Sequence, residues 1–239
     1  MLSDFTSTYI HSGSLHQALH LPNTSLFEIL DFIKNQLPIW RDRTDREHET
    51  AEDRLTSQLC FHLNSAARQH MDFIQFQHQT PDEQKKNRTL DLTASPSGQS
   101  IVIEGHRYTD FDTLMPIECK RLPTPKDHNR EECEYVVTVT PKRLTGGIQR
   151  FKEGHHGANH NIAGMIAYIQ DNTRLFWHNQ VCEWITELTD EGRNGWSNED
   201  QLSISDSDDS KKLSVLQSHH KRANNLPDIQ IQHLWIEMN

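Results

Sequence analysis

The sequence predicts a mixed α/β fold in which helices flank a central mixed sheet, and three observations lead to that prediction. Two stretches near the start of the chain carry apolar residues at helical spacing. Short apolar or alternating segments of strand length follow them. Helical and strand-like segments then alternate to the end of the chain. This order is typical of a sheet whose faces are covered by helices.

The first part of the chain is predicted to be helical after a polar arm. Residues 1–24 are rich in Ser, Thr, His and Asn and indicate an irregular arm. From about Ser25 to Leu37, apolar residues recur every three or four positions. Pro38 is expected to end this helix, because proline lacks the N–H that a helix interior needs. A second helix is predicted from about His48 to Gln69 on a stripe of leucines and alanines.

The middle of the chain is predicted to supply most of the sheet. Four segments have the alternation or apolar content of short strands: residues 73–77, 88–94, 100–104 and 114–122. Polar, turn-forming residues separate these segments. Residues 135–140 also have an extended pattern, so a further strand is expected there.

Helices and strands are expected to alternate in the last third. Helices are predicted at residues 148–152 and 172–188, with a buried strand at 164–169 between them. Residues 189–210 are rich in Gly, Ser, Asn and Asp and predict a loop. Two final strands, at 212–219 and 229–238, are expected to form a C-terminal hairpin.

Composition indicates a polar globular protein of the cytoplasm. Hydrophobic residues make up 34% of the 239 positions, and no run of 18 apolar residues occurs, so no membrane-spanning helix is expected. The N-terminus lacks a basic segment followed by an apolar one, which argues against a secretory signal. Four scattered cysteines favour free thiols in a reducing compartment over a disulfide framework.

The net charge of −10 bears on the partners of the chain. Contacts to nucleic-acid phosphates need Lys and Arg, and a negative field slows the approach of DNA. Two explanations stay open for a nucleic-acid binder: basic groups gather around one cleft, or a partner subunit supplies most of the grip.

The most informative stretch is Ile117-Glu118-Cys119-Lys120, inside an apolar run typical of a buried strand. Side chains alternate along a strand, so Glu118 and Lys120 share one face and Ile117 and Cys119 the other. A buried charged pair is costly unless the two groups serve each other or a ligand. Asp91 lies 27 positions upstream on another predicted strand and is expected to meet this pair.

Such a group predicts a metal centre. Magnesium prefers hard oxygen ligands and keeps several waters. Asp91, Glu118 and the carbonyl of Cys119 would supply that shell, and the metal would lower the pKa of its water and offset charge on a phosphate. Lys120 would orient the attacking water or help to deprotonate it.

Four stretches of the chain form one pattern: Glu52, Arg88-Thr89-Leu90-Asp91, Ile117-Glu118-Cys119-Lys120 and Gly147-Ile148-Gln149-Arg150-Phe151. This pattern resembles the restriction-endonuclease-like superfamily of PD-(D/E)xK nucleases. That family has a central mixed sheet flanked by helices, in the order helix, three strands, helix, strand, and cleaves DNA or RNA with magnesium. Two departures are visible: Leu90 replaces the proline of the motif, and a longer gap before Glu118 implies an insertion around residues 95–112.

The resemblance implies roles for six residues. It implies three metal ligands for Mg²⁺, with Mn²⁺ as an alternative: Asp91, Glu118 and Glu52. It also implies that Lys120 is the catalytic lysine, and that Gln149 and Arg150 contact the site or the substrate. The likeness covers roughly residues 48–170, the core of a nuclease-like domain at 48–239 whose C-terminal helix and strands span 171–239. Residues 1–47 add an N-terminal arm and a helical extension.

The implied function is a metal-dependent nuclease that hydrolyses phosphodiester bonds, with DNA favoured over RNA. Restriction, phage defence and mobile elements are settings in which the family occurs, and the motif does not choose among them. The alternative is a non-catalytic subunit of the same fold that binds or scaffolds within a larger complex. A protein partner or a homodimer stays open, and no membrane partner is expected.

Simpler explanations stay open for the individual residues. Glu118 and Lys120 would also suit an ordinary ion pair on an edge strand. Glu52 would also suit a solvated helix position, and Arg150 would also suit a carboxylate pair. A histidine-rich loop at residues 154–161 offers a third hypothesis, a hydrolase whose metal is bound by three imidazoles: His155, His156 and His160.

Overall fold

The structure, a computed structural model, describes residues 24–82, 88–125, 131–138, 146–193, 195–223 and 225–239. The polar arm expected at residues 1–24 lies outside these ranges except for Thr24, so it stays a prediction.

Within the described ranges, seven strands form one mixed sheet in the order β1-β2-β5-β6-β9-β8-β7. The bounds are β1 (Ile74–Pro81), β2 (Thr89–Pro96), β5 (Met115–Leu122), β6 (Ile162–Ile169), β7 (Ser203–Asp208), β8 (Leu213–His220) and β9 (Ile229–Glu237). The pairs β5–β6 and β6–β9 are parallel, and the other pairs are antiparallel. The predicted mixed sheet is confirmed, and so is the antiparallel pair of final strands, β8 and β9.

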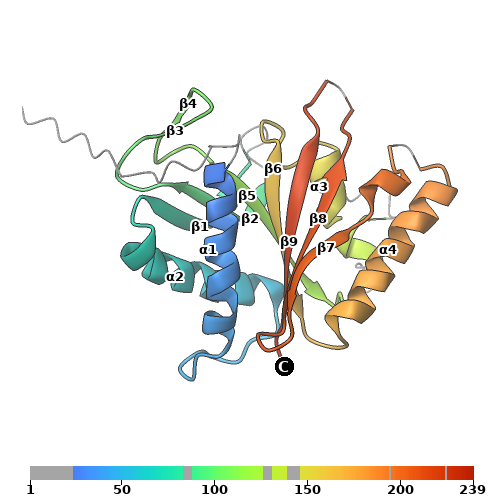
Figure 1. The fold of residues 1–239 in the computed structure, drawn as a ribbon, viewed down its shortest axis with the longest axis horizontal. Helices are drawn as coiled ribbons and strands as arrows, with labels where there is room; N and C mark the ends of the chain where they lie inside the picture. Colours follow the sequence, from blue (N-terminus) through green and yellow to red (C-terminus); the bar gives the residue numbers. More distant parts are fainter. Residues whose placement is uncertain (1–23, 83–87, 126–130, 139–145, 194, 224) are drawn as a thin grey trace, which may run out of the picture.

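Helices cover both faces of this sheet (Figure 1). They are α1 (Thr24–Arg41), α2 (Glu52–His70), α3 (Gly147–Lys152) and α4 (Arg174–Asp190), with 3-10 turns η1 (Glu132–Tyr135) and η2 (Asn198–Asp200). A small hairpin of β3 (Ile101–Ile103) and β4 (His106–Tyr108) lies between β2 and β5 in the sequence and projects from the sheet (Figure 1). It fills the insertion that the long gap between Asp91 and Glu118 implies.

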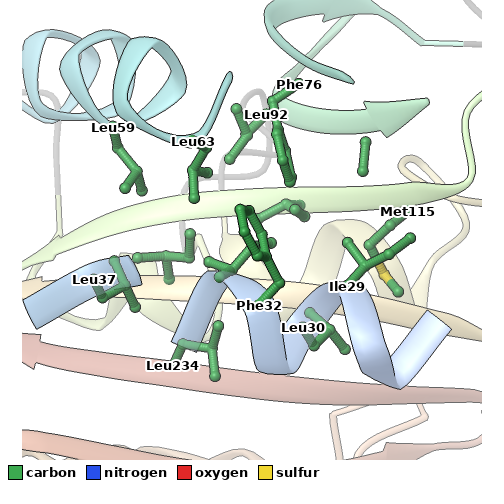
Figure 2. Close-up of a cluster of buried hydrophobic side chains, with 14 of the residues drawn as sticks. Ile29, Leu30, Phe32, Leu37, Leu59, Leu63, Phe76, Leu92, Met115 and Leu234 are labelled. Carbon is green, nitrogen blue, oxygen red and sulfur yellow. The ribbon is translucent and has the colours of Figure 1, made fainter. Parts of the chain in front are cut away.

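The first core lies between α1, α2 and one face of the sheet (Figure 2). Phe32 of α1 stacks on Phe76 of β1, with ring centroids 6.0 Å apart. A Cβ added to Gly164 of β6 would lie 3.0 Å from a methyl carbon of Leu30, so glycine there lets α1 approach the sheet closely. Ile117 and Cys119 of β5 belong to this core, as the predicted alternation requires.

The second core lies on the opposite face, between α3, α4 and η1. The central strand β6 is buried along its whole length, because both of its faces are covered. Glu118 and Lys120 point to this second face, where Leu122 of the same strand packs. The strand that carries the charged pair is therefore an interior strand of the sheet and not an edge strand.

The first helix continues past Pro38, so the prediction that this proline ends it is wrong. Helix α1 extends to Arg41. Trp40 is 1% exposed and packs on Tyr168, with ring centroids 5.8 Å apart. Arg41 donates to two backbone carbonyls at the far end of the sheet, at 2.7 and 3.2 Å. These tertiary contacts outweigh the hydrogen bond that proline removes.

Two other segments differ from the sequence prediction. Tyr135 closes the 3-10 turn η1 instead of starting a strand, and residues 139–140 lie outside the described ranges. The segment 189–210, expected as a loop, contains η2 and the strand β7. β7 is an exposed edge strand, so it lacks the apolar alternation by which buried strands are recognised.

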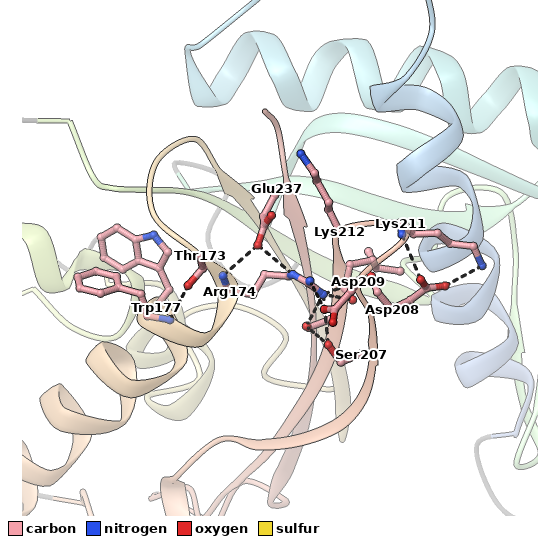
Figure 3. Close-up of polar contacts among 12 residues, drawn as sticks. Thr173, Arg174, Trp177, Ser207, Asp208, Asp209, Lys211, Lys212 and Glu237 are labelled. Carbon is pink, nitrogen blue, oxygen red and sulfur yellow. Dashed lines mark hydrogen bonds and ion pairs between the residues drawn. The ribbon is translucent and has the colours of Figure 1, made fainter.

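Arg174 joins the start of α4 to the C-terminal strands (Figure 3). Its Nε lies 3.0 Å from Glu237 of β9, and its Nη2 lies 2.7 Å from Asp209 in the β7–β8 turn. Its Nη1 also donates to the backbone carbonyl of Leu213 in β8. One guanidinium thus fixes the helix relative to β8, β9 and the β7–β8 turn.

Candidate functional site

The site begins where β2 and β5 separate. Their ladder runs from Ala94–Met115 to Leu92–Ile117. Beyond it, the backbone N–H of Cys119 donates to Oδ2 of Asp91 at 2.9 Å. A carboxylate therefore takes the place of a ladder bond on this edge of β5.

Glu52 at the start of α2 occupies the next position along the same edge. Its Oε2 accepts a hydrogen bond from the backbone N–H of Arg121 at 2.9 Å. Helix α2 packs on the face of the sheet that carries the first core. Its first residue, Glu52, therefore reaches the site through the gap between β2 and β5. Backbone donors of one strand thus hold two carboxylates, from β2 and from α2.

Lys120 connects these two carboxylates with Glu118. Its Nζ lies 2.7 Å from Oε1 of Glu118, 3.5 Å from Oε1 of Glu52 and 3.8 Å from Oδ2 of Asp91. The side chain of Glu118 is fully buried, whereas Asp91 keeps 28% and Glu52 18% of their side-chain surface exposed. The group therefore faces solvent on the side of Asp91 and Glu52.

Two further groups hold the buried carboxylate of Glu118. Arg150 of α3 donates from Nη1 to Oε1 of Glu118. Nδ1 of His156 lies 3.1 Å from the other oxygen, Oε2. Both oxygens of Glu118 therefore have a fixed partner on the second face of the sheet.

The electrostatics divide the three acids of the site. Burial would raise the pKa of Glu118, but Lys120, Arg150 and His156 together outweigh burial and hold that pKa below its usual range. Burial, followed by the negative charge of Glu118, raises the pKa of Asp91 to about 7. Burial would lower the pKa of Lys120, but the three carboxylates outweigh it and raise that pKa. Near neutral pH, Lys120 and Glu118 are charged, and Asp91 is poised between its two forms.

Of the six predicted site residues, Gln149 does not join the group in its described contacts. Its Oε1 accepts from the backbone N–H of Thr138 at 3.0 Å, and its Nε2 donates to Glu153 at 2.7 Å. The side chain is 8% exposed and supports the segment before α3. The other five, Glu52, Asp91, Glu118, Lys120 and Arg150, come together.

The glycine pair at the start of α3, Gly146 and Gly147, has a packing role. A Cβ on Gly146 would lie 2.5 Å from the backbone of Val137, and a Cβ on Gly147 would lie 2.7 Å from the carbonyl oxygen of Tyr135. Only glycine allows α3 to start so close to η1. This close contact places α3 near enough to β5 for Arg150 to reach Glu118.

The three imidazoles of the histidine-rich loop have different neighbours. His155 lies 3.6 Å from Glu153, whereas His156 contacts Glu118. His160 lies at the far end of the loop, where its backbone N–H donates to the carbonyl of Gly157 at 3.0 Å. The contact of His156 with Glu118 is not among the sequence predictions, which group His156 with His155 and His160.

A buried chain of polar side chains behind the site was also missed. Successive members lie 2.6–2.8 Å apart: Lys152, Asp200, His220, Ser218, His233, Tyr135 and Trp235. They come from α3, η1, η2, β8 and β9. No local pattern reveals such a chain, because its hydrogen bonds join residues far apart in the sequence.

The donor set suits a hard divalent cation by its chemistry. Three carboxylates already lie within 4 Å of one positive centre, the ammonium of Lys120. With Asp91 ionised, the three carboxylates carry one more negative charge than Lys120 and Arg150 carry positive charge. As the side chains stand, however, the described residues contain no group of three or more His, Cys, Asp or Glu side chains that could hold a metal ion.

The chain matches no protein-family model, no curated protein and no solved structure. The nuclease resemblance therefore rests on the motif residues of this chain and stays a prediction. Among the described helices, none has both the length and the apolar content needed to cross a membrane.

Proposed function

We propose that this chain is a metal-dependent nuclease that hydrolyses phosphodiester bonds in nucleic acid, with DNA favoured over RNA. In this proposal Asp91, Glu118 and Glu52 bind Mg²⁺ or Mn²⁺, and Lys120 is the catalytic lysine. One observation carries the proposal: the carboxylates of α2, β2 and β5 surround one lysine at a gap in the sheet. This is the set of residues that the PD-(D/E)xK resemblance selects.

The charges of the site support a cation-binding role. The raised pKa of Asp91 means that burial, followed by the charge of Glu118, makes a negative charge at Asp91 unfavourable, and that Lys120 balances this only in part. A divalent cation would relieve this repulsion more strongly than a single ammonium does. When bound, such a cation supplies Lewis-acid charge and a water of lowered pKa.

Each protein group then has a defined task. Asp91 and Glu52 are oriented by the backbone of β5, so little ordering is needed when they bind. Arg150 and His156 fix Glu118. A bound cation would offset the carboxylate charges that raise the pKa of Lys120, and Lys120 would then orient or deprotonate the attacking water.

A second candidate is a non-catalytic subunit of the same fold. The observation in its favour is that Lys120 already pairs with all three carboxylates, as in a structural ion cluster. The net charge of −10 favours it too, because it weakens the grip on nucleic acid.

Calorimetric titration with Mg²⁺ and Mn²⁺ separates the two candidates. The nuclease proposal predicts one metal-binding event. Its affinity should fall at least about tenfold in Asp91→Asn and in Glu118→Gln, because each substitution removes the charge of one proposed metal ligand. Asp72→Asn is a matched control, because Asp72 is exposed and lies after α2, outside the site. Absence of binding in the unaltered chain, or equal binding in all variants, would favour the non-catalytic subunit.

A further inference from the structure

A hollow of 570 Å³ opens at the start of β5, at the opposite end of this strand from the gap. We call it the aromatic hollow, and its lining includes His106, Tyr108, Phe111, Thr113, Asn159 and His160. Its volume lies within the range of about 300–1,000 Å³ that small-ligand pockets occupy.

Phe111 is the most exposed large apolar side chain among the described residues, at 98%. The turn that carries it is fixed: Oδ2 of Asp112 accepts from both the backbone N–H and the hydroxyl of Thr109, each at 2.7 Å. The backbone N–H of Asp112 also donates to the carbonyl of Thr109 at 3.0 Å. These hydrogen bonds order the turn, and the phenyl ring lies in solvent beside the hollow.

The other walls are equally well defined. The rings of His106 and Tyr108 meet edge to face, with centroids 4.5 Å apart. The loop that carries His160 is held by Arg222, which donates to the carbonyls of Gly157 and His160 at 3.0 and 2.7 Å. The hollow is thus formed before any ligand enters it.

This hollow and the candidate metal site share a strand and a loop. Thr113 precedes Glu118 by five residues, roughly 17 Å along an extended chain. A Cβ on Gly157 would lie 3.0 Å from Pro116, so the loop runs along the face of β5 that carries Glu118. The preceding residue, His156, contacts Glu118 itself. At the 3.4 Å spacing of a stacked strand, a separation of about 17 Å corresponds to about five nucleotides.

The lining selects the chemistry of the ligand. Aromatic faces bind flat rings of any base, and the hollow offers the phenyl ring of Phe111 and the imidazole ring of His106. Among the described residues that line the hollow there is no Lys or Arg, and Asp112 adds a carboxylate. These groups suit a base and disfavour a phosphate.

We propose that the aromatic hollow binds an unpaired nucleobase of the substrate, stacked on Phe111, within a few nucleotides of the scissile phosphate. This inference rests on the proposed nuclease function and specifies its substrate as a strand with unpaired bases. A base inside a duplex cannot enter the hollow without leaving its stack.

The test is equilibrium binding in EDTA, where metal-dependent hydrolysis is absent. The probes are a single-stranded oligonucleotide with one 2-aminopurine, whose fluorescence falls on stacking, and the duplex of the same sequence. We expect the single strand to bind more tightly than the duplex, with quenching. Phe111→Ala should weaken this binding by about 5- to 150-fold, the range that one base–aromatic stack supplies.

Two variants serve as controls. Phe61→Ala removes another exposed phenylalanine, on α2 and 75% exposed, and should leave binding unchanged. Phe111→Trp keeps an aromatic face and should restore binding and quenching. Unchanged affinity in Phe111→Ala, an equal loss in Phe61→Ala, or no preference of the unaltered chain for the single strand would each overturn the inference.

Failure of this inference can be told from failure of the proposed function. In one outcome, the unaltered chain cleaves nucleic acid with metal and Phe111→Ala binds the single strand normally. This result would reject the base-binding inference and retain the nuclease proposal. In the other outcome, Phe111→Ala loses binding but the unaltered chain shows no cleavage. This result would retain the base-binding site and reject the nuclease proposal.

Discussion

The carboxylate of Asp91 accepts a hydrogen bond from the backbone N–H of Cys119 at 2.9 Å, at the point where β2 and β5 stop pairing. The end of the ladder is thus also the place where the candidate ligand is held. The next backbone donor on the same edge, the N–H of Arg121, holds Glu52 in the same way. The backbone of one strand therefore positions both of the solvent-facing acids of the site.

Asp91→Asn is expected to stabilise the metal-free protein at neutral and alkaline pH. The folded pKa of Asp91, about 7, lies above the value of about 3.9 in an unfolded chain. Between these values the folded state holds a proton that the unfolded state has released, so stability falls as pH rises from about 4 to 7. The variant lacks this loss and should gain of order 1–2 kcal/mol at pH 8, given the partial exposure of Asp91.

Urea unfolding in EDTA at several pH values measures this effect. The difference in unfolding free energy between the variant and the unaltered chain should grow with pH and level off above about 7. A constant difference, or a variant that is less stable at pH 8, would show that the pKa of Asp91 is not raised in the folded protein.

His156→Ala is expected to weaken metal binding as well as stability. It leaves Oε2 of buried Glu118 without its partner at 3.1 Å, which should cost about 1–3 kcal/mol. His156→Asn is the matched variant, because its amide nitrogen can replace Nδ1 as a donor. Calorimetric Mg²⁺ affinity and urea unfolding should both fall in the alanine variant and recover in part in the asparagine variant. Equal metal affinity in all three proteins would show that His156 does not orient Glu118.

Asp200→Asn is expected to destabilise the protein strongly. Nζ of buried Lys152 lies 2.6 Å from Oδ1 of Asp200, which also contacts Nδ1 of buried His220 at 2.6 Å. Removal of one charge from a buried pair leaves the other uncompensated and should cost about 3–5 kcal/mol. Thermal unfolding beside the exposed control Asp72→Asn measures it; an equally small shift in both would mean that the buried chain does not stabilise the fold.

The sequence predicts the parts of this fold that local pattern governs. The buried strand around Glu118 is recognisable because apolar residues surround its charged pair, and the alternation gives the correct face to each side chain. Asp91 is placed on a neighbouring strand for the same reason. The grouping of Glu52 with these residues follows from the family resemblance, not from any pattern in α2 itself.

The remaining features depend on tertiary contacts that no local pattern records. Trp40 and Arg41 extend α1 beyond Pro38 through partners on the sheet. The strand β7 forms by backbone pairing with β8, while its side chains stay exposed. His156 reaches Glu118 only because α3 and the following loop fold back along β5.

Cleavage of nucleic acid by the unaltered chain and by Lys120→Ala is the most direct test of the proposed nuclease. We predict hydrolysis with Mg²⁺ or Mn²⁺ and none with EDTA, and a rate about 10²- to 10⁴-fold lower in Lys120→Ala. Lys211→Ala, at a largely exposed lysine in the β7–β8 turn, should cleave like the unaltered chain. Equal rates in Lys120→Ala and the unaltered chain, or no cleavage by the unaltered chain with either metal, would contradict the proposal.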